Sequence, residues 1–339
     1  MEKAIKDDIY WMRKETNLSK IRDILLLIEK YNGLRYTEIA DIGIKEGIFI
    51  KKDGTPLAKS PIYHCIRAAL KLGLITQNKS KKYLVNWNKP EVRKLIKLRQ
   101  YLAPLNKEEE LIFQKLIIDN PDCREAFFWI FMGKKEFSWK NFVEHGKVVY
   151  IFPTVIEMKG GKQKRKVRTK KYINMETGDQ IVLETPIERM AVEWGLQLWG
   201  RECSLIEEVY IDETRHILYP LDRTLSLEFD YFLKKFLQLY RPFPNSDWSF
   251  FPIDLTIFEL APLLRVSVKE IQNRFFLELW QKFPEYIKFS SSSKGALTFR
   301  SLSEKTDEKV LKNFIKLNNI WMTHIIVHKK LWEMKQWRD

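Results

Sequence analysis

Apolar and polar positions alternate with a helical period in two neighbouring segments of the C-terminal third of the chain. Between the two segments the pattern breaks at residues 265–267. The first apolar stripe follows the i, i+3, i+4, i+7 spacing of one helix face and comprises Ile257, Leu260, Ala261 and Leu264. Ser267 is a good N-cap, and Glu270 follows at the spacing of a capping box, so a second helix should begin there. The apolar face of this second helix comprises Val268, Ile271, Phe275, Leu279 and, one register off, Phe276.

The polar face of the second helix carries side chains that suit contact with DNA. Asparagine and glutamine can pair with adenine, and arginine can pair with guanine, in the major groove. The residues predicted to face outward are Lys269, Gln272, Asn273 and Arg274. After Pro284 the chain alternates like two strands, at residues 286–290 and 296–300, around a short loop that contains Lys294.

Upstream of this pair, an amphipathic helix is predicted at residues 225–240 and a strand at residues 248–253. The order of helix, strand, helix, helix, strand, loop and strand over residues 225–300 resembles the winged helix-turn-helix superfamily of DNA-binding proteins. The resemblance implies that the second helix enters the major groove and that the loop with Lys294 is a wing. Arg265 stands in the turn, where many members have Gly.

A similar order of elements is predicted near the N-terminus. Helices are predicted at residues 19–31, 37–42 and 60–73, followed by strands at 74–77 and 83–86. The third helix should bury Ile62, Cys65 or Ile66, Ala69, Leu70 and Leu72. This part of the chain also resembles a winged helix.

The polar residues of this N-terminal winged helix would contact DNA from its third helix and from its wing. On the third helix the side chains predicted to face outward are Tyr63, His64, Arg67 and Lys71. The loop between the two strands supplies three lysines suited to phosphates, Lys79, Lys81 and Lys82. Residues 43–58 form an insertion between the second and third helices, and Asp53-Gly54 predicts that this insertion is a hairpin.

The middle of the chain is predicted to contain helices, then strands. Helices are expected at residues 89–101, 107–118, 121–131 and 138–145, and Pro104 marks a domain boundary. The later strands are expected at residues 148–158, 167–174, 205–211 and 216–219. This order of helices before strands allows a third, divergent winged helix.

A basic cluster between the first two of these strands is the strongest charge feature of the chain. It contains no acidic residue and comprises Lys159, Lys162, Lys164, Arg165, Lys166, Arg168, Lys170 and Lys171. We interpret the cluster as a β-hairpin arm that lies along DNA phosphates and adds to the salt dependence of binding. The alternative is a flexible, solvated loop or a localisation-like patch, because charge runs are usually exposed.

Residues 307–337 predict one long amphipathic helix. Its apolar side comprises Val310, Phe314, Leu317, Trp321, Ile325, His328 and Trp332. Such a stripe needs a partner, which is either its own winged helix or the same helix of a second copy. A homodimer through this helix would predict a palindromic or repeated DNA site.

Composition agrees with a polyanionic partner. The chain has 339 residues, enough for two or three compact units, and its formal net charge is +15. Its three cysteines are far apart, so neither a disulfide framework nor a zinc site is indicated, and a reducing cytoplasm fits best. The sequence contains neither an apolar run long enough to span a bilayer nor a signal-peptide pattern, so we expect no membrane partner.

We therefore predict an α+β protein in three parts: a winged helix at residues 1–104, a middle domain with the basic β-hairpin at 105–220, and a winged helix at 221–339. The predicted function is sequence-specific binding of double-stranded DNA without catalysis, cofactor or metal, as in a transcriptional regulator. The alternatives are a replication initiator of a plasmid or virus and a non-catalytic scaffold subunit of a nucleic-acid machine. A metal-dependent nuclease is a further alternative, because Glu157-Met158-Lys159 matches the E-x-K ending of restriction-type nuclease sites. It lacks support from an Asp on a preceding strand.

Overall fold

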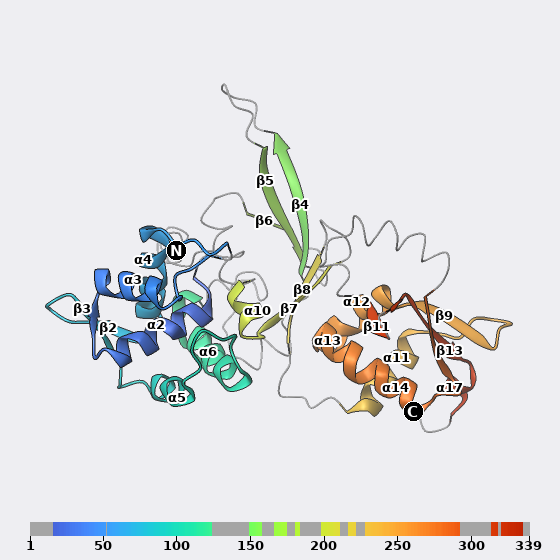
Figure 1. Ribbon diagram of the computed structural model, residues 1–339. Coiled ribbons are helices and arrows are strands. Elements are labelled where there is room, and N and C mark those ends of the chain that lie inside the picture. The colour runs from blue at the N-terminus through green and yellow to red at the C-terminus, as the bar shows by residue number, and fades with distance from the viewer. Residues whose placement is uncertain are drawn as a thin grey trace. The chain divides into compact units, whose positions relative to one another are not determined.

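The chain folds into helices and small antiparallel sheets, which form two compact units (Figure 1). Unit 1 comprises Met1–Phe142 and Ile181–Ile206, and unit 2 comprises Val143–Gln180 and Glu207–Asp339. The residues predicted to form a separate middle domain are thus shared between the two units. The computed structural model describes residues 16–51, 53–123, 149–157, 166–174, 180–183, 198–210, 216–221, 228–291, 313–317 and 320–334.

Unit 1 begins with three helices and a three-stranded antiparallel sheet of strand order β1-β3-β2. The elements follow in the order α2 (Leu18–Lys30), β1 (Leu34–Arg35), α3 (Tyr36–Lys45), α4 (Lys59–Lys71), β2 (Ile75–Gln77) and β3 (Lys82–Val85). The helices and the last two strands lie within a few residues of their predicted positions, whereas β1 was not predicted. The insertion before α4 is a turn closed by a bridge between Ile50 and Pro56, with Gly54 at φ +80°, which confirms the predicted hairpin.

Helix α2 is the centre of unit 1, and side chains from distant parts of the sequence hold it there. Asn17 caps its start, accepting a hydrogen bond from the backbone N–H of Lys20 at 2.9 Å. The carboxylate of Glu202, at the end of the short helix α10 (Gly200–Glu202), accepts two more, from the N–H groups of Leu18 (2.7 Å) and Ser19 (2.8 Å). A carboxylate at a helix N-terminus accepts hydrogen bonds from backbone amides that have no partner within the helix. Its negative charge also interacts favourably with the positive end of the helix dipole.

Unit 1 continues past the predicted boundary at Pro104, because a buried arginine ties the following helix to α2. Two helices follow the sheet, α5 (Pro90–Leu98) and α6 (Lys107–Asp119). The Arg22 side chain is fully buried and pairs with Asp23 (2.8 Å) and Glu109 (3.0 Å), and it donates to the carbonyl of Ala103 (2.7 Å). A buried charge must be paired in this way. Separating α6 from α2 would therefore leave the Arg22 guanidinium without its partner Glu109.

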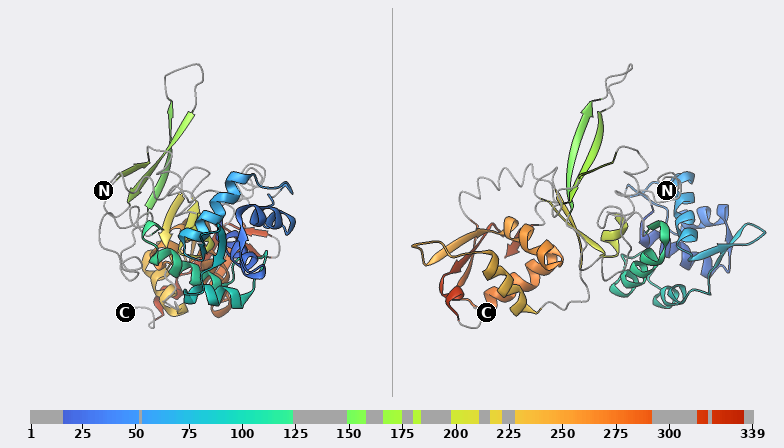
Figure 2. Two further views of the ribbon diagram at one scale, coloured as in Figure 1. Left: turned by 90° about the vertical axis from the view of Figure 1, so that its left-hand side faces the viewer. Right: turned by 180° about the vertical axis from the view of Figure 1, so that it is seen from behind.

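A five-stranded sheet runs in the order β6-β5-β4-β8-β7. Its strands are β4 (Val149–Glu157), β5 (Lys166–Asn174), β6 (Gln180–Leu183), β7 (Ile206–Tyr210) and β8 (His216–Pro220). Strands β4 and β5 pair antiparallel along their whole length, from Val149 opposite Asn174 to Glu157 opposite Lys166, and lie side by side in both views of Figure 2. The predicted β-hairpin is therefore confirmed for these residues.

The C-terminal part of unit 2 combines helices with a three-stranded antiparallel sheet of order β10-β13-β9. The first elements are α11 (Phe229–Leu239), β9 (Trp248–Pro252) and α12 (Ile253–Leu264). A second long helix follows, built from α13 (Val268–Glu270), the π-helical segment η3 (Ile271–Phe276) and α14 (Leu277–Lys282). The remaining elements are β10 (Ile287–Ser290), β11 (Ile315–Leu317), β12 (Ile320–Met322), β13 (His324–His328) and α17 (Lys330–Glu333).

The prediction of one long helix at residues 307–337 is wrong. Within its described residues the chain forms strands β11, β12 and β13, and only the short α17 is helical. In β13 the side chains of Ile325 and Val327 are buried whereas their neighbours are half-buried, which is the two-residue period of a strand. His324 and His328 accordingly lie on a strand, and the helical dimer interface proposed for this segment does not exist in that form.

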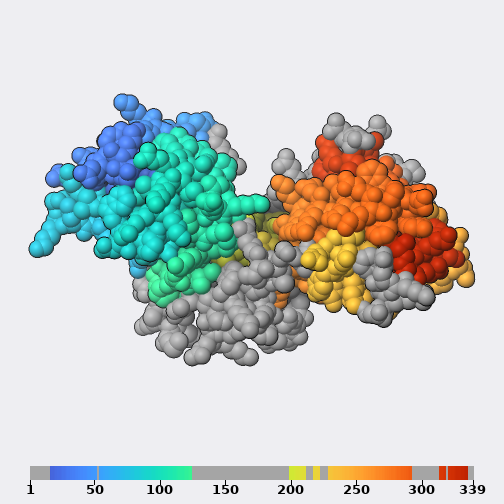
Figure 3. Space-filling model, turned by 90° about the horizontal axis from the view of Figure 1, so that it is seen from below, coloured from blue at the N-terminus to red at the C-terminus, as the bar shows by residue number. Residues whose placement is uncertain are grey.

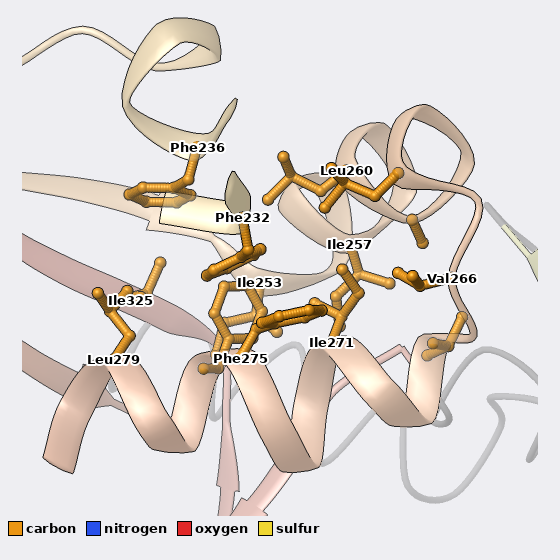
Figure 4. Close-up of a cluster of buried hydrophobic side chains, with 14 of the residues drawn as sticks. Phe232, Phe236, Ile253, Ile257, Leu260, Val266, Ile271, Phe275, Leu279 and Ile325 are labelled. Carbon is orange, nitrogen blue, oxygen red and sulfur yellow. The ribbon is translucent and has the colours of Figure 1, made fainter. Parts of the chain in front are cut away.

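One hydrophobic core joins the helices of this part of unit 2 to one face of its sheet (Figure 4). Phe275 of the second long helix stacks on Phe232 of α11 with ring centroids 4.4 Å apart. Phe276, the next residue, is also fully buried and meets Phe232 edge-on at 6.0 Å. Adjacent residues of a regular α-helix diverge by about 100°, so the wider π-helical turn explains how both rings reach the core.

Candidate nucleic-acid interface

In unit 2, α12 and the second long helix are joined by a three-residue turn at Arg265, Val266 and Ser267. Arg265 adopts the left-handed conformation (φ 54°, ψ 37°), so it takes the backbone path that glycine usually provides. The Val266 side chain is buried, and its carbonyl accepts a hydrogen bond from the hydroxyl of Tyr219 at 2.8 Å. Burial raises the pKa of this Tyr219 phenol well above its usual range, so it remains a donor.

Ser267 caps the second helix as predicted. Its hydroxyl oxygen accepts a hydrogen bond from the backbone N–H of Glu270 at 3.1 Å. The Glu270 carboxylate does not complete a capping box. It pairs instead with Arg274 one turn later, at 3.1 Å. The helix therefore starts at a defined residue, and the orange segment of the chain to which it belongs forms part of the surface of unit 2 (Figure 3).

Three of the four residues predicted on the outer surface of this helix are exposed: Lys269, Asn273 and Arg274. The Arg274 guanidinium lies 5.2 Å from the ring centroid of Phe275, and the ion pair to Glu270 holds it along the helix. Lys269 and Asn273 lie four residues apart, so they project from one side of the helix. Together they present a cation and an amide to solvent on a helix that the core fixes from behind.

The prediction that the Gln272 side chain is exposed on the outer surface of this helix is wrong. It is half-buried, and its amide nitrogen donates to the carbonyl of Phe314 at 2.8 Å. This bond ties the helix to the segment before β11. Gln272 therefore positions the helix, and the candidate interface loses one of its predicted base-reading side chains.

The predicted wing of unit 2 lies only partly within the described residues. Its first strand, β10, pairs with β13, from Ile287 opposite Val327 to Ser290 opposite His324. Strand β13 follows β10 by more than thirty residues, so this pairing does not test the predicted wing. The predicted strand at residues 296–300 and Lys294 lie outside the described residues.

In unit 1, α4 presents part of its predicted polar face. Tyr63 is 47% exposed, whereas His64, Arg67 and Lys71 are half-buried. Lys71 lies 3.5 Å from the carboxylate of Asp122, and the Tyr63 ring meets His64 edge-on at 5.7 Å.

The buried face of α4 differs from the prediction at one position. Leu70 is 37% exposed, and the smaller Ala68 is fully buried in its place beside Ala69. The other predicted residues of this face, Ile62, Cys65, Ile66, Ala69 and Leu72, are buried. Gly73 ends the helix at φ +70°, as its position in the sequence predicted.

The turn between β2 and β3 carries Lys79 and Lys81, and Lys82 begins β3; all three lysines are exposed. The side-chain oxygen of Asn78 organises this turn by accepting hydrogen bonds from the Lys82 N–H (2.9 Å) and the Ser80 hydroxyl (2.8 Å). Lys81 takes the left-handed conformation at φ 59°. An ordered turn that carries exposed lysines is suited to phosphate contacts.

The described part of the basic cluster lies on β5. Lys166, Arg168 and Lys170 occupy alternate positions of this strand, opposite Glu157, Val155 and Pro153 of β4, and Lys171 lies opposite Phe152. The other residues of the cluster, Lys159, Lys162, Lys164 and Arg165, lie outside the described residues.

Neither a metal centre nor a membrane span is found among the residues that the structure describes. No group of three or more histidine, cysteine, aspartate or glutamate side chains is arranged to hold a metal ion there. Glu157 ends β4, and Met158 and Lys159 of the E-x-K sequence lie outside that part of the chain. None of the described helices is both long enough and apolar enough to cross a bilayer.

Sequence reasoning missed one surface that has the chemistry of a binding site. On β9, Ser249 and Phe251 are buried, whereas Phe250 between them is 49% exposed and Trp248 is half-buried. The sequence of this strand did not reveal its open face, because that face carries Trp248 and Phe250 whereas the buried face carries the polar Ser249. Which face is open depends on the side that the helices cover.

In comparisons with known proteins, the chain matched no family model, no curated protein and no solved structure. The geometry of the chain itself is therefore the basis for a functional proposal.

Proposed function

We propose that this protein binds double-stranded DNA in a sequence-specific manner, through two winged-helix units, as a transcriptional regulator does. The observation that carries the proposal is the pair formed by α12 and the second long helix. A three-residue turn joins them, a serine caps the second helix, and Lys269, Asn273 and Arg274 are exposed on its first turns. Helix-turn-helix proteins place the N-terminal part of such a helix against base edges in the major groove.

The order of elements supports the same class of fold in both units. In unit 1 the order is α2, β1, α3, α4, β2, β3, and the three strands form one antiparallel sheet. In unit 2 the order is α11, β9, α12, the second long helix, β10, β11, β12 and β13, and strands β10, β13 and β9 form one antiparallel sheet. Helix, strand, two helices and two further paired strands is the arrangement expected of a winged helix, although in unit 2 β11 and β12 come between the last two strands along the chain.

Electrostatics supports a polyanionic partner. The formal net charge is +15, and the lysines at 79, 81 and 82 lie exposed on an ordered turn next to α4 in sequence. In our proposal Asn273 reads a base edge, Arg274 reads a base once it leaves Glu270, and the lysines contact phosphates. We propose the basic ribbon of β4 and β5 as a further backbone contact.

The test is a selection of bound duplexes from random DNA, followed by affinity measurements with single variants. Asn273→Ala should weaken binding to the selected duplex by about 1 to 3 kcal/mol and binding to random duplexes very little. Lys269→Ala should weaken both to a similar extent. Gln238→Ala on α11, which removes an exposed amide from a different helix, is the matched control and should change neither.

Two results would overturn the proposal. One is the absence of duplex binding by the wild-type protein at low ionic strength. The other is an equal loss on selected and random duplexes for Asn273→Ala, because a base-reading side chain must discriminate between them.

A further inference from the structure

The three-stranded sheet of unit 2, formed by β10, β13 and β9, has one face that none of the described helices covers. Its other face packs on the core through Phe251, Ile287, Ile325 and Val327, all of which are buried. Even helix α17 adds its Trp332 to the covered side, where the indole lies 6.1 Å from the ring of Phe251. We call the open side the outer sheet face and define it by Trp248, Phe250, Lys288, Ile326 and His328.

Strand register brings these five residues together. Phe250 lies opposite Ile326, which lies opposite Lys288 on the other neighbouring strand, so the three form a row across the sheet. Trp248 lies opposite His328 in the next row on this face. Side chains directly opposite each other are about 5 Å apart at their Cβ atoms, so the two rows make one continuous surface.

The aromatic side chains on this face are arranged around a cation. The Lys288 ammonium lies 4.3 Å from the ring centroid of Trp248, and the His328 imidazole meets the same indole edge-on at 4.7 Å. The ammonium therefore lies against Trp248, which is two residues from Phe250 on the same face of β9. Phe250 itself is 49% exposed.

Further cations lie at one end of this face. Lys329 and Lys330 follow β13 directly and are exposed, and Lys329 pairs with Asp247 at 2.6 Å. The face thus combines an apolar aromatic surface with a positive margin. The chemistry that complements both is a planar base carried on a phosphate backbone.

We propose that the outer sheet face binds single-stranded nucleic acid, with one base stacked on Phe250 and the backbone phosphate of that nucleotide on Lys288. This site differs from the helix proposed for duplex DNA, which packs on the opposite side of the sheet. Bases within a duplex are already stacked on their neighbours, whereas an unstacked base of a single strand can stack on Phe250.

Charge argues against a second copy of the chain as the occupant. A two-fold interface would place the same patch of both copies face to face. Lys288 and Lys330 of each copy would then approach those of the other, over an apolar surface of only a few side chains, whereas the charge of Lys329 is offset by Asp247.

The experiment measures the fluorescence anisotropy of a labelled oligothymidylate titrated with the full chain. Phe250→Ala should weaken its binding by about 10-fold, since a base stacked on an aromatic ring contributes on that order. Phe250→Tyr should retain the affinity, because it keeps the ring. Lys288→Ala should weaken binding and reduce its dependence on salt.

The matched control is Tyr231→Ala on α11. Tyr231 is 48% exposed with the Lys235 ammonium 5.6 Å from its ring, so it has the same chemistry on a different surface. This variant should bind the oligothymidylate like the wild type. A circular dichroism melt of each variant checks that folding is unchanged.

Separate arms distinguish this site from the duplex site. Phe250→Ala should leave duplex binding unchanged, and Asn273→Ala should leave oligothymidylate binding unchanged. The proposal is overturned if Phe250→Tyr loses as much affinity as Phe250→Ala, or if Phe250→Ala changes only the sedimentation coefficient, which would indicate a self-association surface.

Discussion

Arg265 shows how a single residue sets the geometry of the proposed DNA-reading pair. Its left-handed backbone lets the N–H groups of Arg265 and Val266 donate to the carbonyls of Pro262 (3.3 Å) and Ala261 (3.2 Å), which closes the end of α12. For a residue with a Cβ this conformation costs about 1 to 2 kcal/mol. The turn keeps its shape nevertheless, because Val266 is buried beneath it and bonded to Tyr219.

This strain can be measured by comparing Arg265→Gly with Arg265→Ala. Both variants lose the same long side chain, so they differ only in the Cβ and in the entropy of the unfolded chain. We expect the glycine variant to be more stable by about 0.5 to 1 kcal/mol in urea denaturation. Equal stability, or a more stable alanine variant, would contradict a left-handed residue at this position.

Glu46 gives unit 1 a defined dependence on pH. Its carboxylate accepts hydrogen bonds from the Lys30 ammonium (2.8 Å), the Tyr101 hydroxyl (2.5 Å) and the Tyr31 hydroxyl (3.1 Å). These bonds, first that of Lys30, lower the pKa of Glu46 below its ordinary value of 4.5. A carboxyl whose pKa is lower in the folded state stabilises the fold above the unfolded pKa, and this contribution is lost as pH falls through the folded value.

We therefore expect Glu46→Gln to destabilise the protein near neutral pH and to have little effect at pH values below the folded pKa. The measurement is thermal unfolding of wild type and variant at matched ionic strength across the acidic range. The difference between them should shrink steadily as the pH falls from about 5. A difference that stays constant with pH would show that ionisation of Glu46 does not contribute.

Two elements depend on features beyond simple periodicity. The second long helix buries Phe275 and Phe276, which are neighbours in sequence, because η3 widens the turn. Strand β13 is the central strand of its sheet although it is the last to be reached along the chain. Strand β13 lies between β9 and β10, so its backbone forms hydrogen bonds with a neighbouring strand on each side. The spacing of apolar residues alone did not reveal this pairing.

The register of β13 can be tested with paired cysteines. Phe250 and Ile326 lie directly opposite each other on the outer sheet face, so Phe250→Cys combined with Ile326→Cys should form a disulfide on oxidation. Phe250→Cys combined with Ile325→Cys is the control and should not, because successive Cβ atoms point to opposite faces. Mass spectrometry of peptides after alkylation measures both. Efficient cross-linking of the control pair would be inconsistent with this register.

At the scale of the whole molecule, charge distinguishes attraction to DNA from recognition of a sequence. A net charge of +15 favours any polyanion, so affinity by itself would not show where DNA lies. Each unit contains a three-stranded antiparallel sheet of its own. The contribution of one surface must therefore be measured against an equal loss of charge elsewhere.

The lysines of the turn between β2 and β3 allow this comparison. Replacing Lys79, Lys81 and Lys82 with alanine should reduce the slope of log K against log salt by up to about 2.7, or about 0.9 for each phosphate that the protein no longer neutralises. The control removes the same charge from helices α6 and α11, by alanine at Lys107, Lys234 and Lys235. Equal slopes for the two triple variants would exclude this turn as a specific phosphate-binding surface.

Most elements of the fold could be predicted from the sequence, because their signals are local. Ser267 caps the second long helix and Gly73 ends α4, both as expected, and Asn106 caps α6 by accepting a hydrogen bond from the N–H of Glu109 at 2.9 Å. Such signals act within one helical turn, so they depend little on the rest of the chain. The exposed polar residues of the candidate site followed from the same periodicity.

The tertiary structure decided whatever depends on partners far away in sequence. Gln272 follows the polar period of its helix but bonds to Phe314, and Glu202 caps α2 from 184 residues away. Residues 307–337 had the spacing of a helix, yet β-branched side chains such as Ile325 and Val327 fit a pleated sheet as well. Pairing with β9 and β10 decided between these structures, because the hydrogen bonds of a central strand come from other segments of the chain.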